Sequence, residues 1–230
     1  MRKCKIILIL ITCLTVAGVL QAEDARDWAQ FNRYAQQNDS LSRVNADVKV
    51  VFLGNSITQG WREKRPEFFD RHGFVGRGIN GQTSSEMLVR MRQDVIDLHP
   101  QIVVILAGTN DIAQNNGYIS LEHILGNIIS MCELARANHI QPVLCSLLPA
   151  RRFYWTDRIP DAPVLIQKLN AMIRDYAKAN GIPFVDYWSK MAAEDGGLLS
   201  GLSDDDVHPT PAGYQIMEPL ILQTLESLTK

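Results

Sequence analysis

Short, continuous runs of apolar residues, separated by polar stretches, are the clearest pattern in this chain. Runs without alternation are typical of parallel strands, because neither face of such a strand meets water. The strongest runs lie at 49–53, 101–107 and 142–148, and weaker ones, interrupted by glycine or proline, lie at 74–79 and 182–186. The pattern therefore predicts about five strands.

Segments with helical periodicity lie between these runs. In the first of them, Trp28, Phe31 and Tyr34 fall on one helical face. We expect helices over 24–37, 84–98, 121–138, 161–180 and 211–228. Strands that alternate with helices imply right-handed crossovers, so the predicted fold is a three-layer α/β/α sandwich around a parallel sheet.

A basic and apolar segment opens the chain. Three basic residues are followed by an apolar stretch over 6–20, which ends in small and polar residues. This is the pattern of a secretory signal, so we expect a signal peptide over 1–22 and a single domain over 23–230. Export to the periplasm or out of the cell follows, and no membrane span is expected once the signal is removed.

Two other fates of this segment stay open. An uncleaved anchor is disfavoured, because an apolar stretch of about 15 residues is short for a bilayer span. Lipid attachment at Cys13 is the second alternative, although Thr12 is a poor match to the residue before the cysteine of a bacterial lipobox.

The composition is that of an ordinary globular protein with a sizeable core. Of 230 residues, 46% are hydrophobic, and the net charge of -2 argues against nucleic acid or an anionic membrane surface as a partner. Removal of the signal leaves two cysteines, Cys132 and Cys145, both in apolar segments. We expect both to be buried free thiols, although an exported compartment would permit a disulfide. The oligomeric state stays open.

Polar residues gather where the predicted strands end. Ser56 follows the first strand, Asn110 follows the third, and His208 precedes the last helix. Ligands of open parallel sheets bind beyond the carboxyl ends of the strands, so these side chains can meet at one edge. Taken alone, a serine at such a place is equally suited to cap a helix.

These residue types suit attack by a serine on an ester. His208 could act as the base for Ser56, and Asp205, three residues earlier, could orient the imidazole. The backbone N–H groups of Ser56 and Gly81, together with the side-chain amide of Asn110, could stabilise the oxyanion. The sequence thus supplies every part that acyl transfer requires.

The same residues resemble the four sequence blocks of the SGNH (GDSL-type) hydrolases, in the family's order. The blocks are Gly54-Asn55-Ser56, Gly81, Gly108-Thr109-Asn110-Asp111 and Asp205-x-x-His208-Pro209. The resemblance implies a flavodoxin-like sheet and a serine esterase that needs no metal or other cofactor, with the triad and oxyanion roles just described. The chain departs from the family at Asn55, where the family has a non-catalytic aspartate.

Aromatic and basic residues near this edge are candidates for substrate binding. Arg151, Tyr154 and Trp155 follow the fourth strand, and Trp61 lies just past the serine. Aromatic faces pack on sugar rings or acyl chains, and arginine binds carboxylates. The alternative is that these aromatic residues only tether a loop to the core.

We therefore expect an exported serine esterase that removes short acyl groups, acetyl foremost, from carbohydrates or small-molecule esters. Hydrolysis of lysophospholipids, other lipids or thioesters stays open, because the triad does not distinguish these substrates. An inactive glycan-binding module that keeps the fold is the alternative from another class. A metal site in the acidic run at 204–206 is disfavoured, because the run lacks the spaced ligands of a calcium loop.

Overall fold

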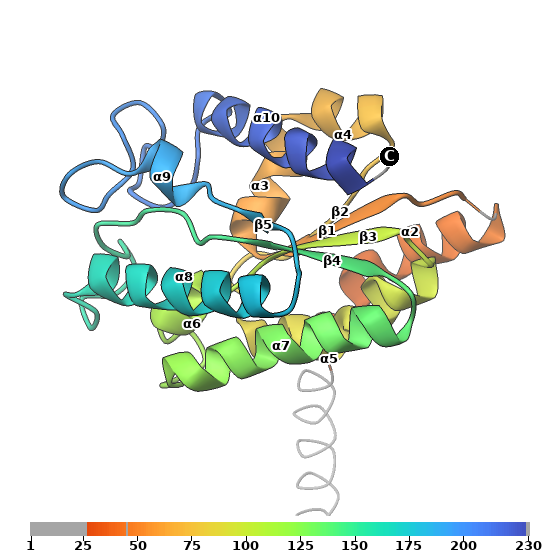
Figure 1. The fold of residues 1–230 in the computed structure, drawn as a ribbon, viewed down its shortest axis with the longest axis horizontal. Helices are drawn as coiled ribbons and strands as arrows, with labels where there is room; N and C mark the ends of the chain where they lie inside the picture. The colour runs from red at the N-terminus through yellow and green to blue at the C-terminus, as the bar shows by residue number, and fades with distance from the viewer. Residues whose placement is uncertain (1–26, 45, 229–230) are drawn as a thin grey trace, which may run out of the picture.

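A parallel sheet of five strands lies at the centre of the protein (Figure 1). The structure is a computed structural model that describes residues 27–44 and 46–228. The strands are β1 (Val50–Gly54), β2 (Val75–Gly78), β3 (Ile102–Leu106), β4 (Gln141–Cys145) and β5 (Phe184–Val185). All neighbours pair in parallel in the order β2-β1-β3-β4-β5, which confirms the predicted sheet.

Helices cover both faces of the sheet and give the predicted three layers (Figure 1). One face carries α3 (Ser56–Lys64), α4 (Pro66–His72), α9 (Trp188–Met191) and α10 (Pro211–Leu228). The other carries α5 (Ser84–Asp94), α6 (Thr109–Ile112), α7 (Leu121–Ala137) and α8 (Ala162–Ala179). On that side, α2 (Asn32–Arg43) packs beside α5.

The strand residues alternate between two separate cores. In β1, Val51 and Leu53 pack with α5 and α7, whereas Val50 and Phe52 face α3 and α10. The second core contains an aromatic group formed by Phe52, Trp61, Phe68, Phe69 and Tyr214. Because β1 is buried along its whole length, both cores fix the point at which the chain leaves the sheet.

The first helix differs from the prediction of 24–37. It runs from Asn32 to Arg43, and Trp28, which was expected on one face of the helix with Phe31 and Tyr34, precedes it and is 58% exposed. The Asp27 carboxylate accepts hydrogen bonds from the backbone N–H groups of Phe31 and Asn32 at 2.5 and 2.9 Å. These bonds satisfy donors at the helix start, where no carbonyl of the preceding turn is available.

The second helix and the fourth strand end several residues before their predicted ends. The expected helix over 84–98 ends at Asp94, and a separate 3₁₀ turn follows at Ile96–Leu98. Strand β4 ends at Cys145, before the predicted end, because Leu147 leaves the ladder. Its N–H and C=O bond the amide side chain of Asn170 at 2.7 and 3.1 Å.

The two cysteines of the described chain behave as small hydrophobic residues. Cys132 and Cys145 are both buried and free. Burial raises the pKa of each thiol to about 12, so neither is a thiolate near neutral pH. This confirms the expected free thiols.

The expected signal peptide over 1–22, including Cys13, lies outside the described residues. In residues 27–44 and 46–228, no helix combines the length and the apolar character that crossing a membrane requires.

Two glycine substitutions should have opposite effects on stability. A Cβ on Gly78 would lie 2.1 Å from the Gln59 nitrogen, so Gly78→Ala must push β2 from α3 and should destabilise the protein by about 1–3 kcal/mol. Gly126 lies inside α7 with nothing near its Cβ position, so Gly126→Ala should add about 0.5–1 kcal/mol. Urea denaturation measures both, and unchanged stability of Gly78→Ala would contradict the close packing of β2 and α3.

Candidate active site

Ser56 is the first residue of α3, and only Asn55 separates it from the buried strand β1. Its Oγ lies 2.8 Å from Nε2 of His208, which is 152 residues away in the chain. The capping role is taken by Asn55, whose Oδ1 accepts the Ile57 N–H at 3.0 Å. The Ser56 hydroxyl therefore stays directed at the imidazole, and Asn55 serves the helix without a carboxylate.

The carboxylate of Asp205 orients the His208 ring. Asp205 Oδ2 lies 2.7 Å from Nδ1 of His208. Its other oxygen accepts the N–H groups of Val207 and His208 and the hydroxyl of Ser203 at 2.9, 2.7 and 3.1 Å. Desolvation alone would raise the pKa of Asp205, but the hydrogen bonds from His208 and Val207 outweigh it, and the net shift is downward. The carboxylate is thus ionised and fixed in orientation.

Contacts between α3 and the chain around the start of α10 bring Ser56 close to His208. Tyr214 in α10 is fully buried, and its hydroxyl donates to the Ile57 carbonyl at 2.8 Å. Lys64, at the end of α3, donates to the Pro209 carbonyl at 2.8 Å. Both bonds join the serine helix to the chain that surrounds the histidine.

The three predicted oxyanion donors lie around one small pocket. Ser56, Gly81, Asn110 and His208 all line a cavity of about 210 Å³. As the first helical residue, Ser56 has an N–H without an intrahelical acceptor. Gly81 has a φ of +79°, which favours glycine. The Asn110 amide donates one bond, to the Gln82 carbonyl at 2.9 Å, and this bond orients the amide that lines the pocket.

A fully buried arginine, Arg90 of α5, binds chain segments that line or adjoin this pocket. Its guanidinium donates to the side chains of Gln82 and Asp94 at 2.5 and 2.9 Å. It also donates to the backbone carbonyls of Gly54 and Arg77 at 2.9 and 3.0 Å. Gly54 stands two residues before the serine, and the Gln82 carbonyl holds the oxyanion amide, so one side chain connects both parts of the site.

The sequence interpretation did not identify Arg90. The local signal is an Arg90–Asp94 pair at i,i+4 spacing, on a helix whose residues Met87 and Met91 are fully buried. Charged residues among buried methionines indicate an internal ion pair, because exposed pairs lie on the opposite, polar face.

The Asn110 turn is fixed by its neighbour Asp111. The buried Asp111 carboxylate accepts the Ser84 N–H at 2.9 Å and the Ser84 hydroxyl at 2.5 Å. Desolvation raises the pKa of Asp111, and the bonds from Ser84 oppose that shift. The contact joins the start of α5 to α6. It thereby helps to position the amide of Asn110 in the pocket that Gly81 also lines.

The loop over residues 151–155, called the aromatic loop below, combines substrate-site and anchoring positions. Phe153 is 1% exposed and anchors the loop in the core, whereas Tyr154 and Trp155 line the pocket beside Ser56. The Tyr154 ring lies 6.2 Å from the His208 ring. Trp155 donates to Asn115 at 2.9 Å, and Asn115 donates to the Gly81 carbonyl at 3.0 Å.

Two of the four candidate substrate-binding residues lie elsewhere. Trp61 is 2% exposed and stacks on Phe68 and Tyr214 in the second core, so the prediction that it contacts substrate is wrong. Its place on α3 turns it toward the sheet. Arg151 pairs with Asp195 at 2.8 Å and does not line the pocket, so it joins two loops.

The acidic run at 204–206 is divided among different tasks. Asp205 binds the histidine, Asp206 contacts Arg152 at 3.3 Å, and Asp204 is exposed. Across the residues that the structure describes, no group of three or more His, Cys, Asp or Glu side chains is placed to hold a metal ion.

A wider cleft adjoins the serine pocket. It measures about 1020 Å³ and shares Asn80, Gly81, Asn115, Tyr154 and Trp155 with the pocket. Further amide side chains line it, at Gln30, Gln114 and Asn116. The pocket therefore opens into a cleft that carries amides and aromatic rings, together with the charged side chains of Glu86, Asp157 and Arg158.

A parallel α/β sheet with Ser, His and Asp joined at its carboxyl edge is the arrangement of a serine hydrolase. Residues 52–216 match the model of the GDSL-like lipase/acylhydrolase family. The chain belongs to this family, and the resemblance seen in its sequence blocks is confirmed.

Individual relatives and solved structures are similar to this chain to different degrees. A GDSL-like lipase from Bacteroides thetaiotaomicron is 50% identical, with a TM-score of 0.85 over 88% of this chain and 100% of that one. The uncharacterised lipoprotein YqeF of Bacillus subtilis strain 168 is 28% identical over 168 residues, 62% of this chain and 69% of the relative. The acetyl xylan esterase AlAXEase, 21% identical, shares the fold with a TM-score of 0.62 over 77% of this chain and 98% of its own.

Replacing Arg90 should impair turnover more than substrate binding. Arg90→Lys keeps the charge but cannot reach all four acceptors, so the serine turn and the oxyanion amide lose a common support. We expect a lower melting temperature and a kcat reduced about 10- to 100-fold, with KM for 4-nitrophenyl acetate nearly unchanged. Arg92→Lys, at an exposed site on the same helix, is the control. Wild-type kcat in Arg90→Lys would contradict the positioning role.

Asp205→Asn should lower kcat/KM by about 10²–10⁴, because the neutral amide cannot stabilise an imidazolium. Asp204→Asn, one residue away and exposed, should stay near wild type.

Comparison of the Asp205→Asn variant with wild type also tests the pKa of Asp205. Because that pKa is lower in the folded protein than its usual value, the ionised group stabilises the fold above a pH of about 4 and loses this effect as the pH falls. The difference in melting temperature between wild type and Asp205→Asn should therefore shrink in acid. A constant difference from pH 7 to 3 would contradict the lowered pKa.

Proposed function

We propose that the protein is an exported esterase that removes small acyl groups, acetyl foremost, from carbohydrates. The observation that carries this proposal is the continuous contact from Ser56 through His208 to Asp205, at 2.8 and 2.7 Å, beside the pocket lined by the three expected oxyanion donors. The family assignment supports acyl hydrolysis in general, and the finer substrate is our inference.

The geometry supports a two-step mechanism. His208 Nε2 removes the Ser56 proton while Oγ attacks the acyl carbon, and the carbonyl electrons move onto the oxygen. The bond to the sugar oxygen then breaks, and the imidazolium gives its proton to the leaving alcohol. Water, deprotonated by the same nitrogen, attacks the acyl-enzyme, and the imidazolium then gives that proton to the Ser56 oxygen, which releases the acid and the free serine.

Asp205 and the oxyanion donors lower the barrier by electrostatics. The ionised Asp205 stabilises the imidazolium that forms in each step. The N–H groups of Ser56 and Gly81 and the amide of Asn110 surround the place where the oxygen becomes negative. One such donor contributes about 10²–10³ in rate.

The shape and lining of the site favour a small acyl group on a sugar. The pocket at Ser56 measures about 210 Å³ and has few aliphatic side chains around it, so it suits acetyl better than a long chain. The adjoining cleft offers amides for hydroxyl groups and two aromatic rings, Tyr154 and Trp155, for sugar faces. The shared fold with AlAXEase, an acetyl xylan esterase, agrees with this direction.

Export is part of the proposal. The basic and apolar start of the chain supports a signal over 1–22. The relative YqeF is a lipoprotein, which keeps lipid attachment at Cys13 as the alternative to release.

A fluorophosphonate probe tests the nucleophile. Wild type should be labelled stoichiometrically and Ser56→Ala should not, while Ser40→Ala, at an exposed serine on α2, serves as the control. Labelling that survives in Ser56→Ala would refute the role of Ser56, and an unlabelled wild type that binds glycans would support the inactive-module alternative.

Chain-length profiling tests the substrate class. With 4-nitrophenyl esters, we expect kcat/KM to fall at least about tenfold from acetate to octanoate, because the pocket does not accommodate the longer chain. Preference for octanoate would favour a lipid esterase instead.

A further inference from the structure

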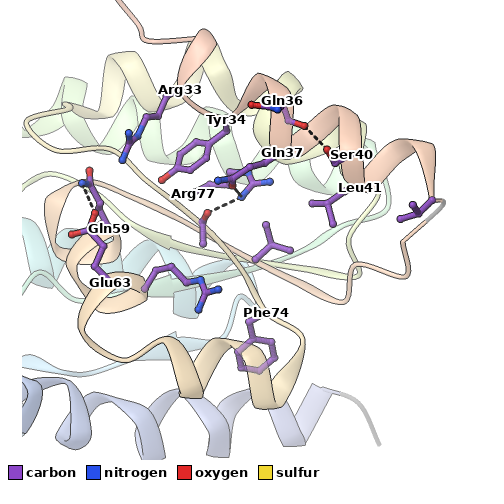
Figure 2. A pocket seen from close by; sticks show the side chains of 14 residues that line it. Arg33, Tyr34, Gln36, Gln37, Ser40, Leu41, Gln59, Glu63, Phe74 and Arg77 are labelled. Atoms are coloured by element: carbon purple, nitrogen blue, oxygen red, sulfur yellow. Dashed lines mark hydrogen bonds between the residues drawn. The ribbon is translucent and has the colours of Figure 1, made fainter.

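A separate groove of about 830 Å³ is lined by residues of α2, α3 and β2 (Figure 2). Its walls come from α2 and α3, and its floor is the edge strand β2. The mechanism proposed above uses none of the residues that line it.

The groove is connected to the serine pocket through Gln59. Gln59 Oε1 accepts the N–H of Asn80, which lines that pocket, and its amide donates to Glu63 at 2.8 Å. Ser56, Gln59 and Glu63 stand at i, i+3 and i+7, so they share one face of α3. Seven residues of helix cover about 10 Å. A chain molecule held in the groove could therefore present a neighbouring unit to Ser56.

The floor of the groove does not accept an added β-strand. Parallel pairing leaves the carbonyls of Gly76 and Gly78 on the outer edge of β2, but both are occupied. Arg77 donates to Gly76 at 2.8 Å, and the Tyr34 hydroxyl donates to Gly78. Recognition in the groove must therefore come from side chains, which disfavours an extended peptide.

The side chains give the groove a positive character. The charged residues that line the groove are three arginines, Arg33, Arg62 and Arg77, and one carboxylate, Glu63. Arg62 pairs with Asp70 at 2.8 Å, and Arg77 is buried against Asn38. Arg33 is exposed, and no ion pair joins it to a carboxylate within the described part of the chain.

Uncharged polar groups complete the lining. Gln36, Gln37 and Gln59 contribute amides, and Figure 2 shows them on both sides of the Arg33 side chain. Amides suit hydroxyl groups, and an arginine without a carboxylate partner suits an anion.

We propose that this groove binds a carboxylate-bearing sugar unit of the acylated glycan, with Arg33 contacting the carboxylate. The inference rests on the proposed function and adds that the preferred glycan is acidic. A guanidinium supplies a planar pair of donors that matches a carboxylate, and the amides nearby accept and donate to ring hydroxyls.

The charge reversal Arg33→Glu tests the groove, with Arg43→Glu as the matched control. Arg43 lies on the same helix outside the groove and is also exposed to solvent, where it pairs with the exposed Asp39. The substrates are acetylated galacturonan oligosaccharides, acetylated xylo-oligosaccharides and 4-nitrophenyl acetate. We expect Arg33→Glu to raise KM for the acidic oligosaccharide about tenfold or more. The neutral substrates should be unaffected, and Arg43→Glu should resemble wild type throughout.

Salt gives a second readout, since wild-type KM for the acidic substrate should rise from 50 to 500 mM NaCl and the dependence should weaken in Arg33→Glu. Equal effects of the two variants, or equal loss on neutral xylo-oligosaccharides, would overturn the inference.

A binding experiment separates this inference from the proposed function. Titration of the full-chain Ser56→Ala protein with unacetylated oligogalacturonate should show saturable binding that Arg33→Glu abolishes. Binding that persists in the double variant, or is absent from the start, overturns the groove assignment even where the enzyme hydrolyses acetyl esters. Saturable binding by a protein that hydrolyses no ester would support the groove and refute the esterase.

Discussion

The Arg90 guanidinium is the interaction on which the rest of the site depends. It lies between α5 and the sheet without contact with water, and it donates to the end of β1, to the end of β2 and to Gln82. Desolvation lowers the pKa of this group, and Asp94 opposes the shift. A buried charge is tolerated only with a full set of partners. The same set of partners brings together the chain that carries the serine and the chain that carries the oxyanion donors.

The acid–base half is built on a different principle, namely a short loop held by its own carboxylate. Asp205 accepts three bonds at one oxygen and orients His208 with the other, so the loop and the imidazole are ordered together. Tyr214 then fixes this part against α3. The proposed nucleophile, Ser56, thus lies on rigid secondary structure, and the proposed base, His208, lies on a loop held by its own hydrogen bonds. Contact between Ser56 and His208 depends on the packing of α3 against α10 in the aromatic core. Trp61 belongs to that core and therefore has a structural role.

The sequence predicted most of the fold and most of the site, for a physical reason. Strands buried on both faces form continuous apolar runs, and residues that follow such strands meet at one edge, so Ser56 and Asn110 could be found without coordinates. His208 follows no strand, and its place before the last helix, three residues after Asp205, identified it. The pairing of Arg90 with Asp94 could indicate burial of Arg90, but its support of the site could not be found, because its acceptor Gly54 lies 36 residues away. Trp61 was misplaced because sequence proximity to the serine does not say which face of α3 a side chain occupies. The capping role of Asn55 depends on backbone geometry that sequence does not reveal.

The central claim is that Ser56 carries the acyl group during turnover. Rapid acid quenching of the wild-type protein during hydrolysis of 4-nitrophenyl acetate, followed by peptide mass spectrometry, tests it most directly. The account predicts a transient acetyl group on the peptide that contains Ser56, at the hydroxyl of that residue, which disappears when substrate is exhausted. An acetyl group on another residue during turnover, or steady hydrolysis with no acetylated peptide under conditions that trap such esters, would contradict it.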